Sequence, residues 1–247
     1  MELEIINMYP DILNLYGDIG NLIAIKQRCR WRNIKVNIHN FTVDNEISIE
    51  NGDIILIGGG ADSGQNIVSK NLQKQRNKLS QHIESEKPIL AICGSYQMFG
   101  DKYIDANKNE IPCLELFDME TINENNRLIG NILINTSLNI AEKRIIGFEN
   151  HGGRTYHKYK PFGEVVLGNG NNGKDKTEGM IYKNFIGSYL HGPLLPKNPT
   201  FTDYIIFNAL NVKYGIESLE NINIGLNDSI EENAQIAIGK KLFKKKF

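Results

Sequence analysis

Apolar residues in the first part of the chain come in short runs separated by longer segments of mixed polarity. Four runs rich in isoleucine and valine, without helical periodicity, are typical of buried strands. They occupy residues 3–8, 34–38, 53–57 and 88–92. Between them, residues 18–31 and 63–86 place apolar side chains at helical spacing. Strands that alternate with helices in this way predict a parallel sheet with helices on both faces.

The second half of the chain has strand-like runs separated by turns rich in asparagine and glycine. We expect strands at 114–122, 128–134, 145–149, 164–168, 179–183 and 186–190, and helices near 201–212 and 230–243. Short strands joined by such turns predict antiparallel pairing. Because no linker or internal repeat is evident, residues 1–247 are predicted to form a single domain. Its expected fold class is α/β, doubly wound, with a mostly parallel sheet and an antiparallel extension.

The composition is that of an ordinary globular protein. Of 247 residues, 40% are hydrophobic and 23% charged, so a sizeable core can form without a disulfide or a metal. The net charge of −1 gives no reason to expect nucleic acid as a partner. The first residues lack the pattern of a signal peptide, and no apolar run approaches the roughly 20 residues that cross a bilayer. Three cysteines without a pairing pattern favour a reducing, cytoplasmic location.

A buried strand that runs directly into a cysteine is the first candidate for chemistry. In PILAICGSYQ, residues 88–97, Cys93 ends the strand and precedes a segment that can form a helix. This is the arrangement of a nucleophile elbow, which requires small residues two positions to either side, here Ala91 and Ser95. The alternative is an inert cysteine at the end of a core strand.

Three glycines follow the strand at 53–57. Because glycine lacks a Cβ atom, the backbone of IGGGADSGQN, residues 57–66, can approach a ligand closely. The amide of Gly59 or Gly60, together with that of Gly94, can form an oxyanion hole. The alternative is a tight turn that begins a helix. A second glycine-rich segment, residues 168–175, has the spacing of a phosphate-binding loop but continues as a strand, which favours a hairpin and no ATP site in this chain.

His191 also follows a strand, in FIGSYLHGPLLPKN, residues 185–198. A thiol needs a base within hydrogen-bond reach, and histidine titrates in the required range. A lone histidine is more often structural than catalytic, and the position at a strand end is what distinguishes His191. His82, by contrast, lies within a predicted helix, where we expect it on a solvated face.

Polar residues crowd the segment GFENHGGRTY, residues 147–156. Asn150, His151 and Arg154 can line a pocket for a zwitterion or hold a turn together, and the sequence leaves both open. Arg127 stands alone before a strand. Its planar guanidinium can clamp a carboxylate, although a surface arginine is the simpler interpretation.

Taken together, these segments resemble the class I glutamine amidotransferases, in particular the cobyric acid synthase-like branch. The glycines after residue 57, ICGSYQ at 92–97 and YLHGP at 189–193 carry the general resemblance. More specific segments are similar to the glutaminase subunits of bacterial lipid II isoglutaminyl synthases. They are NLYGDIGN at 14–21, GGGADSGQ at 58–65, ENHGGRTYH at 149–157 and GNGNN at 168–172.

The resemblance implies hydrolysis of L-glutamine to glutamate and ammonia. It further implies that the ammonia passes to a Mur-ligase-like partner subunit, which amidates D-glutamate of lipid II in peptidoglycan synthesis. The pair would be a heterodimer, with ATP and magnesium in the partner and no cofactor or metal in this chain. Among the residues, it implies Cys93 as nucleophile, His191 as general base, and Arg127 and Gln97 as substrate-binding groups.

The chain departs from the family pattern at one place. Most class I amidotransferases carry His-x-Glu, whereas Pro193 stands two residues after His191. We therefore expect a Cys–His dyad, with Glu149 or Asp18 as candidate third members. The sequence leaves three alternative functions open. The chain could supply ammonia to a different acceptor, be a different hydrolase with a cysteine elbow on the same architecture, or be a non-catalytic binding subunit.

Overall fold

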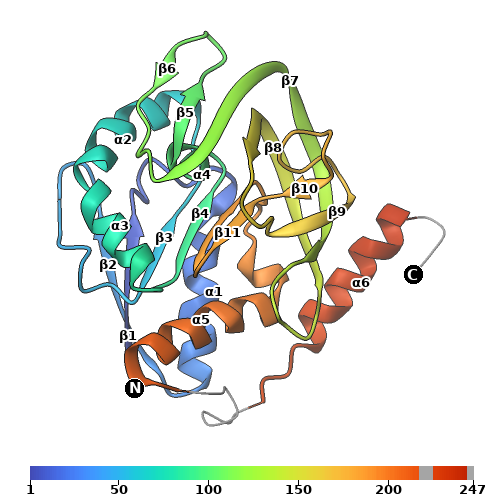
Figure 1. The fold of residues 1–247 in the computed structure, drawn as a ribbon. Coiled ribbons are helices and arrows are strands. Elements are labelled where there is room, and N and C mark those ends of the chain that lie inside the picture. The colour runs from blue at the N-terminus through green and yellow to red at the C-terminus, as the bar shows by residue number, and fades with distance from the viewer. Residues whose placement is uncertain (217–224, 244–247) are drawn as a thin grey trace.

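The computed structural model describes residues 1–216 and 225–243, except the side chains of residues 62, 63 and 241–243. Its described residues form two six-stranded sheets (Figure 1). The first has the order β11-β12-β4-β3-β1-β2. Its strands are β1 Glu2–Met8, β2 Lys35–Phe41, β3 Ile54–Ile57, β4 Ile89–Ile92, β11 Met180–Tyr182 and β12 Phe185–Ser188. Every neighbouring pair is parallel except β11 with β12, which confirms the predicted mostly parallel sheet.

Helices cover both faces of this first sheet (Figure 1). They are α1 Ile19–Trp31, α2 Asp62–Lys74, α3 Arg76–Glu84, α4 Gly94–Met98 and α5 Pro199–Tyr214, with the short 3-10 turns η1 Leu15–Gly17 and η2 Leu195–Lys197. The last helix, α6 Ser229–Phe243, lies apart from this sheet and packs against η2 (Figure 1). The steps from β1 to β2 and from β3 to β4 run in opposite directions across the sheet. Right-handed crossovers therefore place α1 on one face and α2 with α3 on the other, as a doubly wound fold requires.

The helix predicted over 63–86 is two helices. Gln75, with φ −91° and ψ 0°, separates α2 from α3. The change of direction brings the guanidinium of Arg76 to the backbone carbonyls of Leu114 and Glu115, to which it donates hydrogen bonds. Apolar spacing alone does not reveal this interruption, because both helices bury apolar residues at that spacing, Val68 and Leu72 in α2 and Leu79 and Ile83 in α3, although Ile67 is exposed.

Of the strands predicted as an antiparallel extension, the first sheet gains β11 and β12, and β12 pairs with β4 in parallel rather than antiparallel. The remaining strands of this part of the chain form a second sheet rather than an extension of the first. They are β5 Gly100–Ile104, β6 Glu110–Ile111, β7 Phe117–Thr136, β8 Arg144–His157, β9 Gly163–Leu167 and β10 Thr177–Glu178. The alternating pattern predicted strands, but it cannot tell which sheet a hairpin joins. The register of β7 against β8 shifts between Asn123 and Leu128, so residues 124–127 bulge from β7. Residues 168–176 connect the antiparallel strands β9 and β10, in agreement with the predicted hairpin.

Most buried apolar side chains of both sheets belong to one cluster, and Tyr103, Ile111 and Cys113 form a second, small one beside β5 and β6. Because β3, β4 and β12 are parallel, they end at the same edge of the first sheet, and the segments that follow them meet there. Within the described residues, no helix is long and apolar enough to cross a membrane.

Candidate active site

Cys93 occupies a strained corner between β4 and α4. Its backbone has φ +54° and ψ −108°, in a region that residues with a side chain rarely adopt. The Cys93 N–H donates a 2.7 Å hydrogen bond to the carbonyl of Ser188, at the end of β12. Ala91 and Ser95 are both fully buried, and the Ser95 hydroxyl donates to the carbonyls of Ile57 and Ile92. The surroundings therefore hold the corner in place from two neighbouring strands.

His191 reaches the same edge from the end of β12. Two backbone hydrogen bonds with Phe148 of β8 fix it, and its side chain is fully buried. A Cβ atom placed on Gly59 would lie 2.5 Å from His191 Cε1 and 3.2 Å from Cys93 Cβ. The imidazole and the thiol thus come together over the Gly59 backbone, which only glycine leaves free.

Asp18 lies on the other side of the imidazole. Its Oδ2 atom is 3.4 Å from His191 Nδ1 and accepts a 2.7 Å hydrogen bond from the Gly59 N–H. Glu149, the other candidate third member, instead accepts hydrogen bonds from the backbone of Asn169 and Gly170. Of the two carboxylates, it is therefore Asp18 that can orient His191.

The charges around His191 favour its protonated form. Burial by itself would lower the pKa of His191, but the facing Cys93 sulfur and the Asp18 carboxylate raise it to about 10. An imidazolium at this position can stabilise a thiolate, which is the reactive form of a cysteine nucleophile.

The glycines after β3 press against the loop that carries Asp18. A Cβ atom on Gly58 would lie 2.1 Å from the Leu13 carbonyl, and one on Gly60 would lie 2.5 Å from Leu13 Cδ2. The Gly59 amide is engaged by Asp18, whereas among the described residues no hydrogen bond uses the amides of Gly60 or Gly94. The amides of Gly60 and Gly94 are thus available to stabilise an oxyanion, whereas that of Gly59 is not.

Gln65 of α2 joins these two glycines, a role that the sequence did not reveal. Its Nε2 donates to the Gly60 carbonyl at 3.1 Å. The same nitrogen lies 2.1 Å from the position that a Cβ on Gly94 would occupy. The buried amide of Gln65 therefore fixes the spacing between the two glycines.

Arg127 lies in the bulge of β7 and is exposed at the rim of the site. Its Nε and Nη2 donate to the side-chain and backbone oxygens of Asn150, at 2.8 and 2.7 Å. Asn150 Nδ2 in turn donates to the hydroxyl of Tyr16, whose ring packs edge-on against His191 with centroids 4.9 Å apart. Arg127 is therefore linked to the imidazole through two side chains, of which Tyr16 was not among the predicted residues.

Gln97 is buried one helical turn after Cys93. Its Nε2 donates to the Tyr189 hydroxyl at 3.0 Å, while its Oε1 has no hydrogen-bond partner among the described residues. An unpaired buried oxygen costs free energy unless a ligand satisfies it. Gln97 is thus placed near the thiol with an acceptor unused.

The other polar residues of β8 take different roles. The Arg154 guanidinium donates to the carbonyls of Gly152 and Asn126, so it holds the bulge of β7 in place and supports the turn-holding alternative. His151 is buried and stacks on Tyr189 with ring centroids 3.6 Å apart. The expectation that His82 lies on a solvated face was wrong. His82 lies on the buried face of α3, and burial lowers its pKa to about 4.

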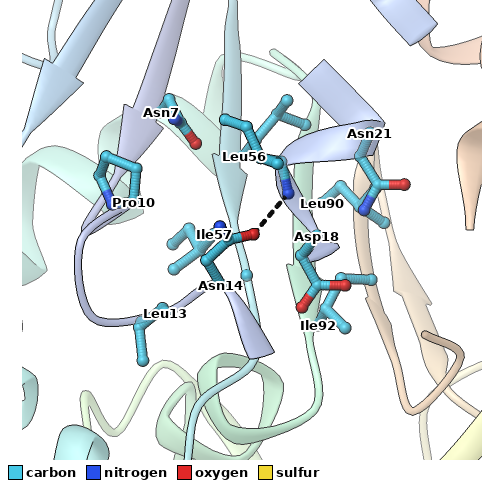
Figure 2. Close-up of a pocket in the computed structure, with 12 residues that line it drawn as sticks. Asn7, Pro10, Leu13, Asn14, Asp18, Asn21, Leu56, Ile57, Leu90 and Ile92 are labelled. Atoms are coloured by element: carbon cyan, nitrogen blue, oxygen red, sulfur yellow. Dashed lines mark hydrogen bonds between the residues drawn. The ribbon is translucent and has the colours of Figure 1, made fainter. Parts of the chain in front are cut away.

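A small cavity adjoins Asp18 at the ends of β1, β3 and β4 (Figure 2). Asn7, Asn14 and Asn21 line it, and the Ile19 N–H donates to Asn14 Oδ1 at 2.9 Å. Its volume of about 10 Å³ suits about one water molecule and is too small for an amino acid. No cluster of three potential metal ligands occurs among the described residues.

Comparison with known proteins gives two kinds of match. Residues 4–199 match the family of CobB/CobQ-like glutamine amidotransferase domains. The chain is 46% identical over 208 residues to a Staphylococcus aureus (strain N315) protein named lipid II isoglutaminyl synthase (glutamine-hydrolyzing) subunit GatD, covering 84% of this chain and 82% of that protein. A Streptococcus pneumoniae protein of the same name is 36% identical over 217 residues, covering 87% and 83%. A probable cobyric acid synthase of Methanococcus maripaludis (strain C6) is 31% identical, covering 75% of this chain but 41% of that protein.

Solved structures agree with the fold. A chain of PurLQS from Thermotoga maritima superposes with a TM-score of 0.55 at 14% identity, covering 85% of this chain and 99% of that one. A glutamine amidotransferase from the same organism gives a TM-score of 0.52 at 14% identity, covering 90% and 86%. At this identity the likeness concerns the fold alone.

Proposed function

Because this chain belongs to the CobB/CobQ-like glutamine amidotransferase family, we propose that it is the glutamine-hydrolysing subunit of a lipid II isoglutaminyl synthase. The observation that carries the proposal is the meeting of the Cys93 thiol and the His191 imidazole over Gly59. The names of the two bacterial relatives supply the pathway. Catalysis is then an acyl transfer through a thioester.

In the first step, the Cys93 thiolate attacks the side-chain amide carbon of L-glutamine. The amides of Gly60 and Gly94 donate to the oxyanion that forms on the former carbonyl oxygen. His191, protonated, gives its proton to the departing nitrogen, so that ammonia leaves and a glutamyl thioester remains on Cys93.

In the second step, neutral His191 removes a proton from water, which attacks the thioester carbon. Collapse of the tetrahedral intermediate breaks the carbon–sulfur bond, releases glutamate and regenerates the Cys93 thiolate beside the imidazolium. Asp18 keeps Nδ1 protonated and directed toward itself throughout, and so leaves Nε2 to exchange protons with the reacting atoms.

Arg127 and Gln97 are the proposed substrate-binding residues. The Arg127 guanidinium offers Nη1, which has no hydrogen-bond partner among the described residues, to the α-carboxylate of glutamine. Gln97 Oε1 is an acceptor for an N–H of the substrate. We propose that the whole chain acts as one domain and that the ammonia passes to a Mur-ligase-like, ATP-using partner subunit in the cytoplasm. Three buried, unpaired cysteines fit that reducing location.

The test is glutamate release from L-glutamine by the purified chain, alone and with a Mur-ligase-like subunit, ATP and lipid II. Cys93→Ala is compared with Cys113→Ala, because both residues are 7% exposed. We expect release that Cys93→Ala abolishes and Cys113→Ala preserves, together with amidated lipid II in the presence of the partner. Release without lipid II amidation would assign a different acceptor. Absence of release from folded protein in both conditions would contradict the enzyme and favour a non-catalytic subunit.

A further inference from the structure

One amide side chain lies between the arginine at the rim of the site and the aromatic ring that covers the imidazole. Asn150 Oδ1 accepts from Arg127 Nε, while Asn150 Nδ2 donates to the Tyr16 hydroxyl. The backbone carbonyl of Asn150 also accepts from Arg127 Nη2. The side-chain oxygen of Asn150 therefore binds Arg127, and its side-chain nitrogen binds Tyr16.

Tyr16 belongs to the same loop as Asp18. Its backbone has φ +64°, a left-handed conformation that is costly for a tyrosine and is held here by neighbouring contacts. The Leu15 N–H donates to the Gly59 carbonyl at 2.9 Å, and the Gly17 N–H donates to the Asn14 carbonyl at 3.2 Å. The loop thus presents two side chains to His191: the carboxylate of Asp18 at Nδ1 and the ring of Tyr16 against the imidazole.

The Tyr16 ring is more than one third exposed, whereas His191 is fully buried. Tyr16 therefore separates the imidazole from solvent on one side. The loop fixes the backbone of Tyr16, but its hydroxyl is fixed from the second sheet, by Asn150 of β8 and Arg127 of β7. The position of the ring over His191 consequently depends on residues of the opposite sheet.

The Arg127 guanidinium retains a second edge. Asn150 occupies Nε and Nη2, and among the described residues Nη1 makes no hydrogen bond. A carboxylate can therefore bind at the Nη1 and Nη2 edge without displacing Asn150. Binding there would hold the Arg127 guanidinium more firmly against Asn150. Because Asn150 also binds Tyr16, the position of the Tyr16 hydroxyl would then be fixed more firmly too.

We propose that Asn150 is a shared positioning residue, which couples the carboxylate-binding fork of Arg127 to the catalytic imidazole of His191 through the hydroxyl of Tyr16. The inference rests on the proposed glutaminase function and assigns to Asn150 and Tyr16 roles that the reaction mechanism alone does not require. Arg127 and His191 are then one unit, so that a substrate bound by its α-carboxylate finds the base already in place.

The first test is a double-mutant cycle on glutamine hydrolysis. Tyr16→Phe keeps the ring and removes only the hydroxyl, and Tyr156→Phe, on the exposed side of β8, is its matched control. We expect Tyr16→Phe to lower kcat by about 3- to 10-fold, the effect of one hydrogen bond, with a smaller change in KM. Asn150→Ala should raise KM and lower kcat together, because both partners lose their support.

The decisive comparison is Tyr16→Phe in an Arg127→Ala background. If Arg127 acts on His191 through Asn150 and Tyr16, the added loss in kcat should nearly vanish. If the kcat losses of Tyr16→Phe and Arg127→Ala instead multiply in the double variant, the coupling is overturned. If Tyr16→Phe has the same kcat and KM as Tyr156→Phe, the role of the Tyr16 hydroxyl is overturned.

A second readout does not depend on glutamine. The rate at which iodoacetamide alkylates Cys93, followed across pH, reports thiolate formed beside the His191 imidazolium. Cys93→Ala supplies the background from Cys29 and Cys113. We expect the midpoint of this profile to shift in Tyr16→Phe and Asn150→Ala but not in Tyr156→Phe, and coincident profiles would contradict the proposal. If Tyr16→Phe and Asn150→Ala shift the alkylation midpoint as expected but wild-type protein releases no glutamate, the glutaminase function fails and the positioning of His191 stands.

Discussion

Glu178 of β10 is a fully buried carboxyl directly behind the segment that delivers His191. Its Oε1 accepts a 2.6 Å hydrogen bond from the Tyr189 N–H, and the Ser188 hydroxyl lies 3.2 Å away. Ser188 is also the residue whose carbonyl accepts from the Cys93 N–H. Burial raises the pKa of Glu178 from 4.5 to about 8, although these hydrogen bonds oppose the shift. Glu178 is therefore protonated in the folded protein at neutral pH.

The magnitude follows from linkage between protonation and folding. A folded-state pKa above the unfolded value stabilises the fold fully below pH 4.5, and this contribution is lost as the pH rises through about 8. Each pKa unit corresponds to about 1.4 kcal/mol. The cost of keeping Glu178 protonated in the fold is thus about 1.4 kcal/mol at pH 5.5 and about 4 kcal/mol at pH 7.5.

Glu178→Gln mimics the protonated carboxyl and removes this dependence. The amide oxygen can still accept from the Tyr189 N–H, and the amide nitrogen can donate to Ser188 Oγ. We expect the free energy of unfolding of wild type, relative to Glu178→Gln, to fall by about 2 to 3 kcal/mol between pH 5.5 and 7.5. Urea unfolding at several pH values measures it. Glu164→Gln, on the exposed face of β9, is the control. A difference between wild type and Glu178→Gln that stays constant with pH would refute the reasoning.

Three further perturbations address the site and its support. Asp18→Asn keeps an acceptor for the Gly59 N–H but removes the charge beside Nδ1, and should lower kcat by about 10²- to 10⁴-fold, whereas the exposed Asp11→Asn should not. Gly59→Ala places a Cβ 2.5 Å from His191 Cε1 and should reduce kcat by about 10²-fold or more, and Gly225→Ala, with open space around it, is the control. Arg28→Ala removes the buried partner of Asp228, while Asp203 keeps its ion pair with Arg32, and should destabilise the fold by about 1.5 to 3 kcal/mol in urea unfolding, against little change for the exposed Arg30→Ala. An active Asp18→Asn, a fully active Gly59→Ala or a stable Arg28→Ala would each contradict the corresponding contact.

The sequence predicted the parallel sheet because β3 and β4 are buried on both faces and appear as continuous apolar runs, although β2, at the edge, is half-exposed. The run at 88–92 placed Cys93 at the edge where parallel strands end. His191 lies at the same edge because the strand before it, predicted to pair antiparallel, pairs with β4 in parallel. The antiparallel strands were predicted, but their sheet was not, because alternation along β7 and β8 carries no information on which edge they join.

The sequence narrowed the residue that orients His191 only to two carboxylates. Glu149 and Asp18 both lie beside glycine-rich motifs, and the choice between them depends on where the loop that follows β1 meets the end of β3. Tyr16 escaped notice because its role depends on a left-handed backbone and on a contact with Asn150, which is 134 residues away. His82 was misplaced because the face of α3 that it occupies is covered, and helical spacing did not show by what.

The central claim is that Cys93 carries a glutamyl thioester formed with the help of His191. The most direct measurement is mass spectrometry of the intact protein after rapid acid quenching with L-glutamine, followed by peptide mapping. The account predicts a mass increase of one glutamyl group, located on the peptide that contains Cys93, absent in Cys93→Ala and preserved in Cys113→Ala. Glutamate release without any adduct on Cys93, or an adduct that persists in Cys93→Ala, would contradict it.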